Sequence, residues 1–172
     1  MILIGQYDSP FVRRVAIALH HYGLPFEHRP WSVWADAEKI AQHNPLRRVP
    51  TLLLDDGSAL VETFAILDSI DELAPNGRAL VPPQGVARRD VLRVAALAGG
   101  IADKSVTLLY SALDLMQPSQ IWSERCKQQI LDSLSLLERE RFPSLAAQAA
   151  RCEALPEFQA AYLPITNNLT KS

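Results

Sequence analysis

The feature that most constrains the fold is a change of hydrophobic pattern around the segment Pro82-Pro83-Gln84-Gly85. Up to about residue 75, short strand-like runs alternate with helix-like segments. Beyond residue 85, apolar residues recur only at helical spacing, and no segment is typical of a strand. The sequence therefore predicts an α/β domain over residues 1–78 and an all-α domain over residues 85–172.

The order of elements predicted in the first domain is β-α-β-α-β-β-α. The corresponding segments are 1–7, 11–22, 26–30, 36–42, 51–54, 59–61 and 64–73. The first two strands are separated by a helix, which is typical of a parallel pair, whereas Asp55-Asp56-Gly57 predicts a hairpin between the last two. We therefore expect a mixed sheet covered by helices. In the second domain, helical patterns extend over 86–116, 119–141 and 143–154.

Composition argues against several classes of partner. The 17 basic and 19 acidic residues give a net charge of −2, which implies no basic surface for nucleic acid or membrane. No apolar run approaches the ~20 residues of a membrane-spanning helix, and the N-terminus lacks a signal-peptide pattern. The two cysteines, Cys126 and Cys152, are far apart, and the four histidines lack a metal-site spacing. We expect a soluble, cytoplasmic protein without a bound metal.

The pair Ser9-Pro10 lies where the first strand-like run gives way to a helix. Ser9 is well placed as the N-cap, with Pro10 at the first helical position. A single Ser-Pro pair usually does no more than cap a helix. A hydroxyl at the positive end of a helix dipole can also stabilise a thiolate or another anion, so both interpretations stay open.

Two further pairs lie at strand ends, Val49-Pro50 before the third strand and Glu62-Thr63 after the fourth. A cis Val49-Pro50 bond would leave the backbone of Val49 free to pair with a peptide-like ligand, although most X-Pro bonds are trans. Thr63 is a natural N-cap, and Glu62 beside it can be a simple solvated acid. Together with free helix amides, however, the two would suit the carboxylate and ammonium groups of an amino-acid zwitterion.

Taken in order, these segments resemble the N-terminal domain of bacterial glutathione transferases over about residues 1–78. The matching segments are Ser9-Pro10-x-x-Arg13, Arg48-Val49-Pro50-Thr51-Leu52 and Glu62-Thr63-x-Ala65-Ile66. Leu80-Val81-Pro82-Pro83 is similar to the linker that follows in the family. The resemblance implies a thioredoxin-like N-terminal domain that binds glutathione, plus an all-α C-terminal domain.

The same resemblance implies a serine-type enzyme in which Ser9 donates a hydrogen bond to the glutathione sulfur. A free thiol has a pKa near 8.5, so a hydroxyl and a helix N-terminus that lower this pKa would generate the reactive thiolate. Tyr7 is the alternative donor, because some transferases use a tyrosine near the end of the first strand. We favour Ser9, since the Ser-Pro pair begins a helix and Tyr7 is expected to point into the sheet.

The remaining contacts to glutathione follow from the resemblance in the same way. The residue before Pro50, which is Val49, would pair with the cysteinyl backbone. Glu62 and Thr63 would hold the γ-glutamyl end. Arg48, or its neighbour Arg47, would reach the glycyl carboxylate.

A small electrophile is the expected second substrate, and a detoxification role would follow. Its pocket should include Phe11, Trp34 and Tyr110, although aromatic side chains more often serve the core. Members of the family usually pair as homodimers, which we expect here. The alternative function is a non-catalytic protein that uses the same fold for binding or as a scaffold.

The chain departs from the family at the junction of Arg141 and Phe142. Here the segment 137–141 runs directly into 142–145, whereas the family has more chain between its equivalents. About 30 to 40 residues are absent relative to the family, enough for two ordinary helices with their loops. Either the C-terminal domain is shortened in its core, or a segment has been left out of the sequence, and we favour the second explanation.

Overall fold

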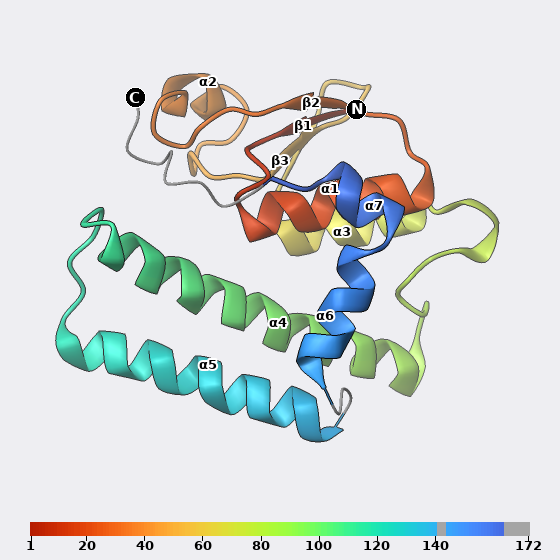
Figure 1. The fold of residues 1–172 in the computed structure, drawn as a ribbon. Helices are drawn as coiled ribbons and strands as arrows, with labels where there is room; N and C mark the ends of the chain where they lie inside the picture. Colours follow the sequence, from red (N-terminus) through yellow and green to blue (C-terminus); the bar gives the residue numbers. More distant parts are fainter. Residues whose placement is uncertain (141–143, 164–172) are drawn as a thin grey trace. The chain divides into compact units, whose positions relative to one another are not determined.

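The structure is a computed structural model of the chain and describes residues 1–140 and 144–163, with the side chain of residue 76 excepted. Figure 1 shows the described elements in chain order. They are β1 (Ile2–Ile4), α1 (Pro10–Tyr22), β2 (Glu27–Arg29), α2 (Ala37–Ala41), β3 (Thr51–Leu53), β4 (Ala59–Val61), α3 (Thr63–Glu72), the 3₁₀ turn η1 (Pro75–Gly77), α4 (Gly85–Ala112), α5 (Gln120–Glu140), α6 (Leu145–Glu153) and α7 (Pro156–Ala160).

Contacts divide the chain into two units, which are described separately. The first unit comprises Met1–Leu80 together with the chain from Glu153 onward, and the second is Val81–Cys152. The short helix α7, which the sequence pattern did not predict, thus belongs with the sheet. The predicted domain limits of 1–78 and 85–172 stay a prediction, and the junction of Arg141 and Phe142 lies outside the described residues.

The four strands form one mixed sheet in the order β2-β1-β3-β4. Strand β1 pairs in parallel with β2 and antiparallel with β3, while β3 and β4 form an antiparallel hairpin. This arrangement confirms the predicted mixed sheet. Strand β1 is shorter than predicted, because the chain turns at Gly5, whose φ is 128°.

The central strands β1 and β3 carry successive apolar residues, which point to opposite faces of the sheet, so both faces are packed. Leu3 and Leu52 lie in the larger core cluster, with buried residues of α1 and α3. Their neighbours Ile4 and Leu53 pack with Ile40 of α2 in a smaller cluster. Figure 1 accordingly shows α1 and α3 on one face of the sheet and α2 on the other. Helix α7 packs against α1.

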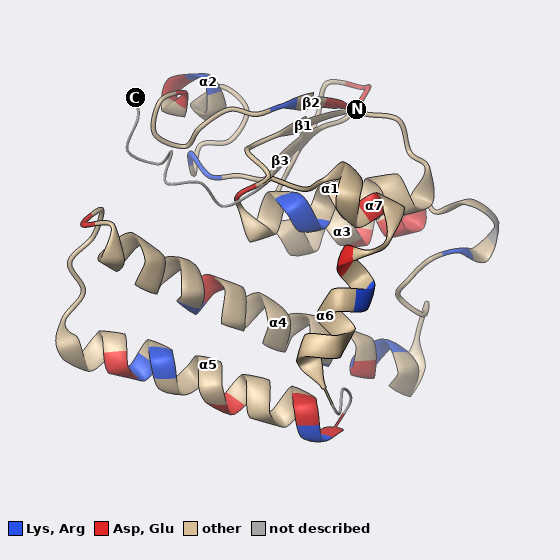
Figure 2. Cartoon of the chain, in the orientation of Figure 1, with Lys and Arg blue, Asp and Glu red and all other residues tan. Residues whose placement is uncertain are grey.

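The second unit is built on the long helices α4 and α5, which pack against each other. Cys126 and Leu137 of α5 are buried, whereas no residue of α4 is fully buried. Both helices carry Lys or Arg interspersed with Asp or Glu (Figure 2). None of the helices in the described part of the chain is long and apolar enough to cross a membrane.

Candidate functional site

Helix α1 begins at the residue that the sequence singled out. Ser9 is its N-cap, and the Ser9 Oγ accepts a hydrogen bond from the Val12 N–H at 3.4 Å. The Ser9 carbonyl accepts the first helical hydrogen bond, from the Arg13 N–H at 2.9 Å. The first turn carries no acidic side chain, so nothing within it offsets the positive end of the helix dipole. The half-buried hydroxyl therefore lies at a position suited to an anion.

The alternative donor, Tyr7, lies in a different environment. Its ring stacks on His28, with the two centroids 3.9 Å apart and the planes 5° from parallel. Tyr7 also packs against the larger core cluster, and burial raises the pKa of its phenol. His28 is in turn held by the Gly5 carbonyl, 2.7 Å from its Nε2. Tyr7 is thus fixed in packing beside the sheet, whereas Ser9 begins the helix.

The peptide bond between Val49 and Pro50 is cis. The loop before it is fastened by Asn44, which is fully buried. The Asn44 amide donates to the Arg48 carbonyl and to Thr51 Oγ1, both at 3.0 Å, and its oxygen accepts from the Leu46 N–H at 3.0 Å. The sequence does not single out Asn44, because nothing local distinguishes an asparagine before a proline from an ordinary turn residue.

Gly5 joins this loop to the start of α1. A Cβ atom at this position would lie 2.5 Å from Cγ2 of Val12 and 2.8 Å from Cβ of Val49. The end of β1 can therefore approach the side chains of Val12 and Val49 this closely only because residue 5 has no side chain. Gly5 is not singled out by the sequence either, since its importance comes from a long-range contact.

The third segment differs from the prediction in its cap. Glu62, not Thr63, is the N-cap of α3, because the Glu62 carbonyl already accepts a hydrogen bond from the Ile66 N–H at 3.1 Å. Thr63 is the first helical residue and is buried, so its predicted role as N-cap is wrong. Glu62 has a φ of 67°, a left-handed conformation that is rare for a residue with a side chain. Its side chain is half exposed and makes no capping bond.

The two candidate arginines have different partners. A guanidinium nitrogen of Arg48 lies 3.1 Å from a carboxylate oxygen of Glu62, so the structure brings the second and third segments together. Arg47 instead pairs with Glu38 of α2 at 2.5 Å. This hydrogen-bonded pair raises the pKa of Arg47 and lowers that of Glu38. Of the two arginines, Arg48 is therefore the one that lies beside Glu62.

The residues predicted for a second-substrate pocket are distributed over both units. Phe11 is half buried in the first turn of α1, and Trp34 is exposed in the segment before α2. Tyr110 lies in α4 of the second unit. Their grouping in one pocket stays a prediction.

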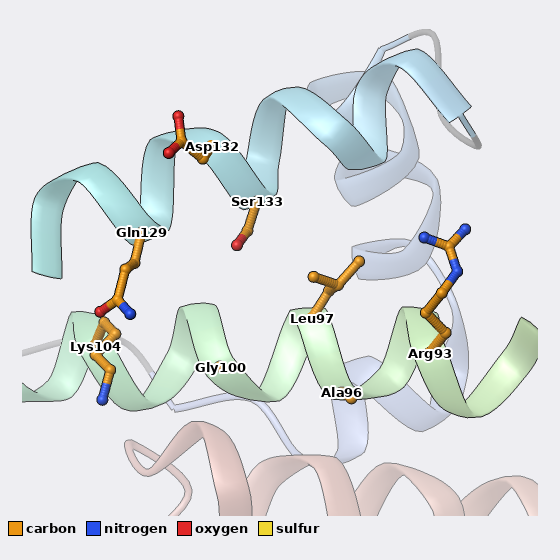
Figure 3. Close-up of a pocket in the computed structure, with 8 residues that line it drawn as sticks. All are labelled: Arg93, Ala96, Leu97, Gly100, Lys104, Gln129, Asp132 and Ser133. Atoms are coloured by element: carbon orange, nitrogen blue, oxygen red, sulfur yellow. The ribbon is translucent and has the colours of Figure 1, made fainter.

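A groove of about 490 Å³ lies within the second unit, between α4 and α5. Figure 3 shows Gln129 of α5 pointing toward Lys104 of α4, while Asp132 points away from α4. The lining includes Leu97 and Ser133 but none of the predicted site residues. Within the described residues, no group of three or more metal-ligating side chains is arranged to hold an ion.

Comparison with known proteins connects this geometry to a family. Residues 3–78 match the family model described as "Glutathione S-transferase, N-terminal domain". The chain is 33% identical over 139 residues to the uncharacterized GST-like protein YibF of Escherichia coli, covering 80% of this chain and 68% of YibF. It is 30% identical over 110 residues to a probable glutathione S-transferase of rice, of whose length the match spans 48%.

Solved structures share the fold. A glutathione transferase family member from Pseudomonas fluorescens, crystallised with bound glutathione, has a TM-score of 0.83 and 28% identity, covering 95% of this chain and 99% of that one. A glutathione S-transferase from Methylobacterium radiotolerans, in complex with glutathione sulfonate, gives the same TM-score and identity, over 96% and 97% of the two chains. The four-stranded sheet with its helices and the helical region therefore form the predicted thioredoxin-like and all-α combination.

Proposed function

We propose that this chain activates the thiol of glutathione at the N-terminus of α1. The proposal starts from its family: the chain belongs to the glutathione S-transferase family and is a glutathione transferase-like enzyme. One observation carries the proposal: three segments far apart in sequence converge. Gly5 joins the start of α1 to the loop at Val49, and Arg48 of that loop reaches Glu62 at the start of α3. Such a site combines two helix N-termini, which suit anions, with a carboxylate that suits an ammonium group.

In the proposed complex, the glutathione sulfur lies at the first turn of α1 and accepts a hydrogen bond from the Ser9 hydroxyl. Together with the positive end of the α1 dipole, the hydroxyl stabilises the thiolate over the thiol. Lowering the thiol pKa by about 2 units corresponds to about 2.7 kcal/mol of differential stabilisation. Ser9 is thus proposed as the catalytic residue, and neither a metal nor another cofactor is required.

The rest of the tripeptide is proposed to bind along the two other segments. The backbone of Val49, which precedes the cis Pro50, pairs with the cysteinyl residue of glutathione. Glu62 binds the ammonium group of the γ-glutamyl end, and the start of α3 at Thr63 binds its carboxylate. Arg48 binds a carboxylate of the tripeptide from its position beside Glu62.

The thiolate then attacks a small electrophile. A carbon–sulfur bond forms as a leaving group such as halide departs with its electron pair, or the sulfur adds to a double bond and water supplies the proton. We propose that Phe11, Trp34 and Tyr110 contribute to the pocket for this substrate. Detoxification in the cytoplasm would be the corresponding role.

We also propose that the protein acts as a homodimer. Phe64, in the first turn of α3, is 48% exposed although it is a large apolar side chain. A second copy that covered it would remove this apolar side chain from water. Equilibrium sedimentation of the wild-type chain tests this part of the proposal, and a monomer at all concentrations would contradict it.

The decisive experiment compares Ser9→Ala with the wild-type chain. Calorimetry should show glutathione binding to both proteins. The ultraviolet absorption of the bound thiolate should show a thiol pKa higher by about 2 units in the variant, and kcat with a chlorinated dinitrobenzene should fall by about 10²-fold at neutral pH.

Ser119→Ala is a matched control, because Ser119 Oγ accepts from the Trp122 N–H at 3.3 Å at the start of α5. Both substitutions should cost about 1 kcal/mol of stability through the lost cap, but only Ser9→Ala should change the thiol pKa. If Ser9→Ala turns over the substrate as fast as the wild-type chain, Ser9 serves only as the N-cap of α1 and is not catalytic. Binding without any turnover in the wild-type chain would support a non-catalytic role.

A further inference from the structure

The side chain of Arg13 is unusually well held by the C-terminal part of the first unit. Two of its guanidinium nitrogens donate to the two carboxylate oxygens of Glu153, at 3.0 and 2.6 Å. Its Nε donates to the Ala161 carbonyl at 3.1 Å. This is a bidentate ion pair plus a backbone hydrogen bond, a geometry in which arginine is not replaceable by lysine.

Aromatic side chains and core packing complete this contact. The guanidinium carbon lies 5.8 Å from the ring centroid of Phe158 and 6.0 Å from that of Tyr162, within the range of cation–π attraction. Ala161 is completely buried in the larger core cluster. The acceptors of Arg13 therefore lie on a segment that is itself anchored, about 140 residues further along the chain.

Arg13 is also part of the turn that presents Ser9. Its N–H donates to the Ser9 carbonyl, and the N–H of the preceding Val12 donates to the Ser9 hydroxyl oxygen. Any movement of Arg13 relative to the sheet is therefore transmitted to the hydroxyl through one helical turn. A displacement of about 1 Å in a catalytic group can cost about 10²-fold in rate.

A second contact between α1 and the same C-terminal segment lies at the far end of α1. Nδ1 of His21 is 3.1 Å from a carboxylate oxygen of Glu157 in α7. His21 is in the last turn of α1, twelve residues after Ser9, so this contact holds the helix without touching its first turn. It provides an internal comparison for the role of Arg13.

We propose that Arg13 is a positioning residue: by binding the C-terminal segment at Glu153 and Ala161, it fixes the first turn of α1 and hence the Ser9 hydroxyl. The inference rests on the proposed function, since it concerns the placement of the group that stabilises the thiolate. It makes the segment from Glu153 to Ala161 part of the catalytic unit through its hold on Arg13.

The test compares Arg13→Gln, Arg13→Lys and Glu153→Gln with the control Glu157→Gln in the full chain. Arg13→Gln should lower kcat about tenfold and raise the pKa of the bound thiol by about one unit, with a much smaller change in glutathione affinity. Arg13→Lys should not restore these values, and Glu153→Gln should shift them in the same direction. Glu157→Gln should leave both at the wild-type values. Hydrogen exchange should be faster at the backbone amides of residues 12 and 13 only in the first three variants.

The outcomes separate this inference from the proposed function. If the wild-type chain acidifies the bound thiol while Arg13→Gln and Glu153→Gln do so equally well, the inference is wrong and the proposed function stands. The same conclusion follows if Glu157→Gln lowers kcat as much as they do. If the wild-type chain fails to bind glutathione, the proposed function fails and the inference with it. If Arg13→Gln does not fold, the result for Glu153→Gln decides whether the inference holds, because this variant weakens the ion pair while keeping Arg13 itself.

Discussion

The close approach at Gly5 makes a sharp test of how the site is assembled. Replacing Gly5 by alanine adds a single methyl group at the point where the end of β1 meets Val12 and Val49. Neither neighbour can yield easily. Val12 is a fully buried β-branched residue, and the atom of Val49 that would be met is its Cβ, which moves only with the backbone.

The magnitude follows from two contributions. A φ of 128° is a conformation that residues other than glycine adopt only at a cost of about 1–3 kcal/mol. Contacts of 2.5 and 2.8 Å are shorter than van der Waals separation, and overpacking of this kind costs about 1–3 kcal/mol more. Gly5→Ala should therefore lower the free energy of unfolding by about 2–6 kcal/mol.

Gly23→Ala separates the two contributions. Gly23 ends α1 with a φ of 68°, and beyond its own chain neighbours no atom of the described residues lies within 4 Å of the position where a Cβ would be. It should cost only the conformational part, about 1–2 kcal/mol. Urea denaturation measures the difference between the free energies of unfolding of the two variants. Calorimetry measures the affinity for glutathione, which should fall about tenfold or more in Gly5→Ala alone, because the Val49 backbone is displaced. Equal destabilisation by the two substitutions, with unchanged affinity, would refute the close-approach argument.

Two further predictions concern residues that support the site. Asn44→Ala removes three hydrogen bonds from a fully buried position and should cost about 2–4 kcal/mol in urea denaturation, with weaker glutathione binding because the loop before Pro50 loosens. Burial and the hydrogen bond to Asp71 raise the pKa of Tyr22 from 10.0 to about 12, so its contribution to stability is complete below pH 10 and is lost as the pH rises to about 12. Between pH 9 and 12, the measured free energy of unfolding should fall more in the wild-type chain than in Tyr22→Phe.

The parts of the fold that the sequence predicts are those with local signals. The hairpin at Asp55-Asp56-Gly57 and the parallel pair around α1 follow from turn residues and apolar spacing, and both are confirmed. The position of Ser9 at a helix start is likewise a local property, because the cap and the following proline are adjacent. Its catalytic role stays a prediction, since capping and thiolate stabilisation require the same residue.

What the sequence does not predict depends on distant contacts. Gly5 and Asn44 act through contacts with residues in other segments, and no local sequence pattern around either residue predicts those contacts. The cap of α3 was misassigned to Thr63, because the left-handed backbone of Glu62 overrides the usual preference for a hydroxyl. Helix α7 is five residues long, too short for an apolar period, and is held by its contacts with α1.

The contacts of Arg13 also decide how this residue can act. A guanidinium near a thiolate would ordinarily be expected to stabilise the thiolate by its positive charge. Here, however, both carboxylate oxygens of Glu153 are bound to the Arg13 guanidinium. The hydrogen bond to Arg13 also lowers the pKa of Glu153 below its usual value. The pair therefore stays ionised at neutral pH and carries no net charge toward the first turn of α1. A charge effect would be screened by salt, whereas a geometric one would not. The double variant Arg13→Gln/Glu153→Gln removes the pair without leaving an unpaired charge. The pKa of the bound thiol should accordingly differ between wild type and this double variant by the same amount at low and high ionic strength, and a difference that disappears in salt would mean that Arg13 acts through its charge.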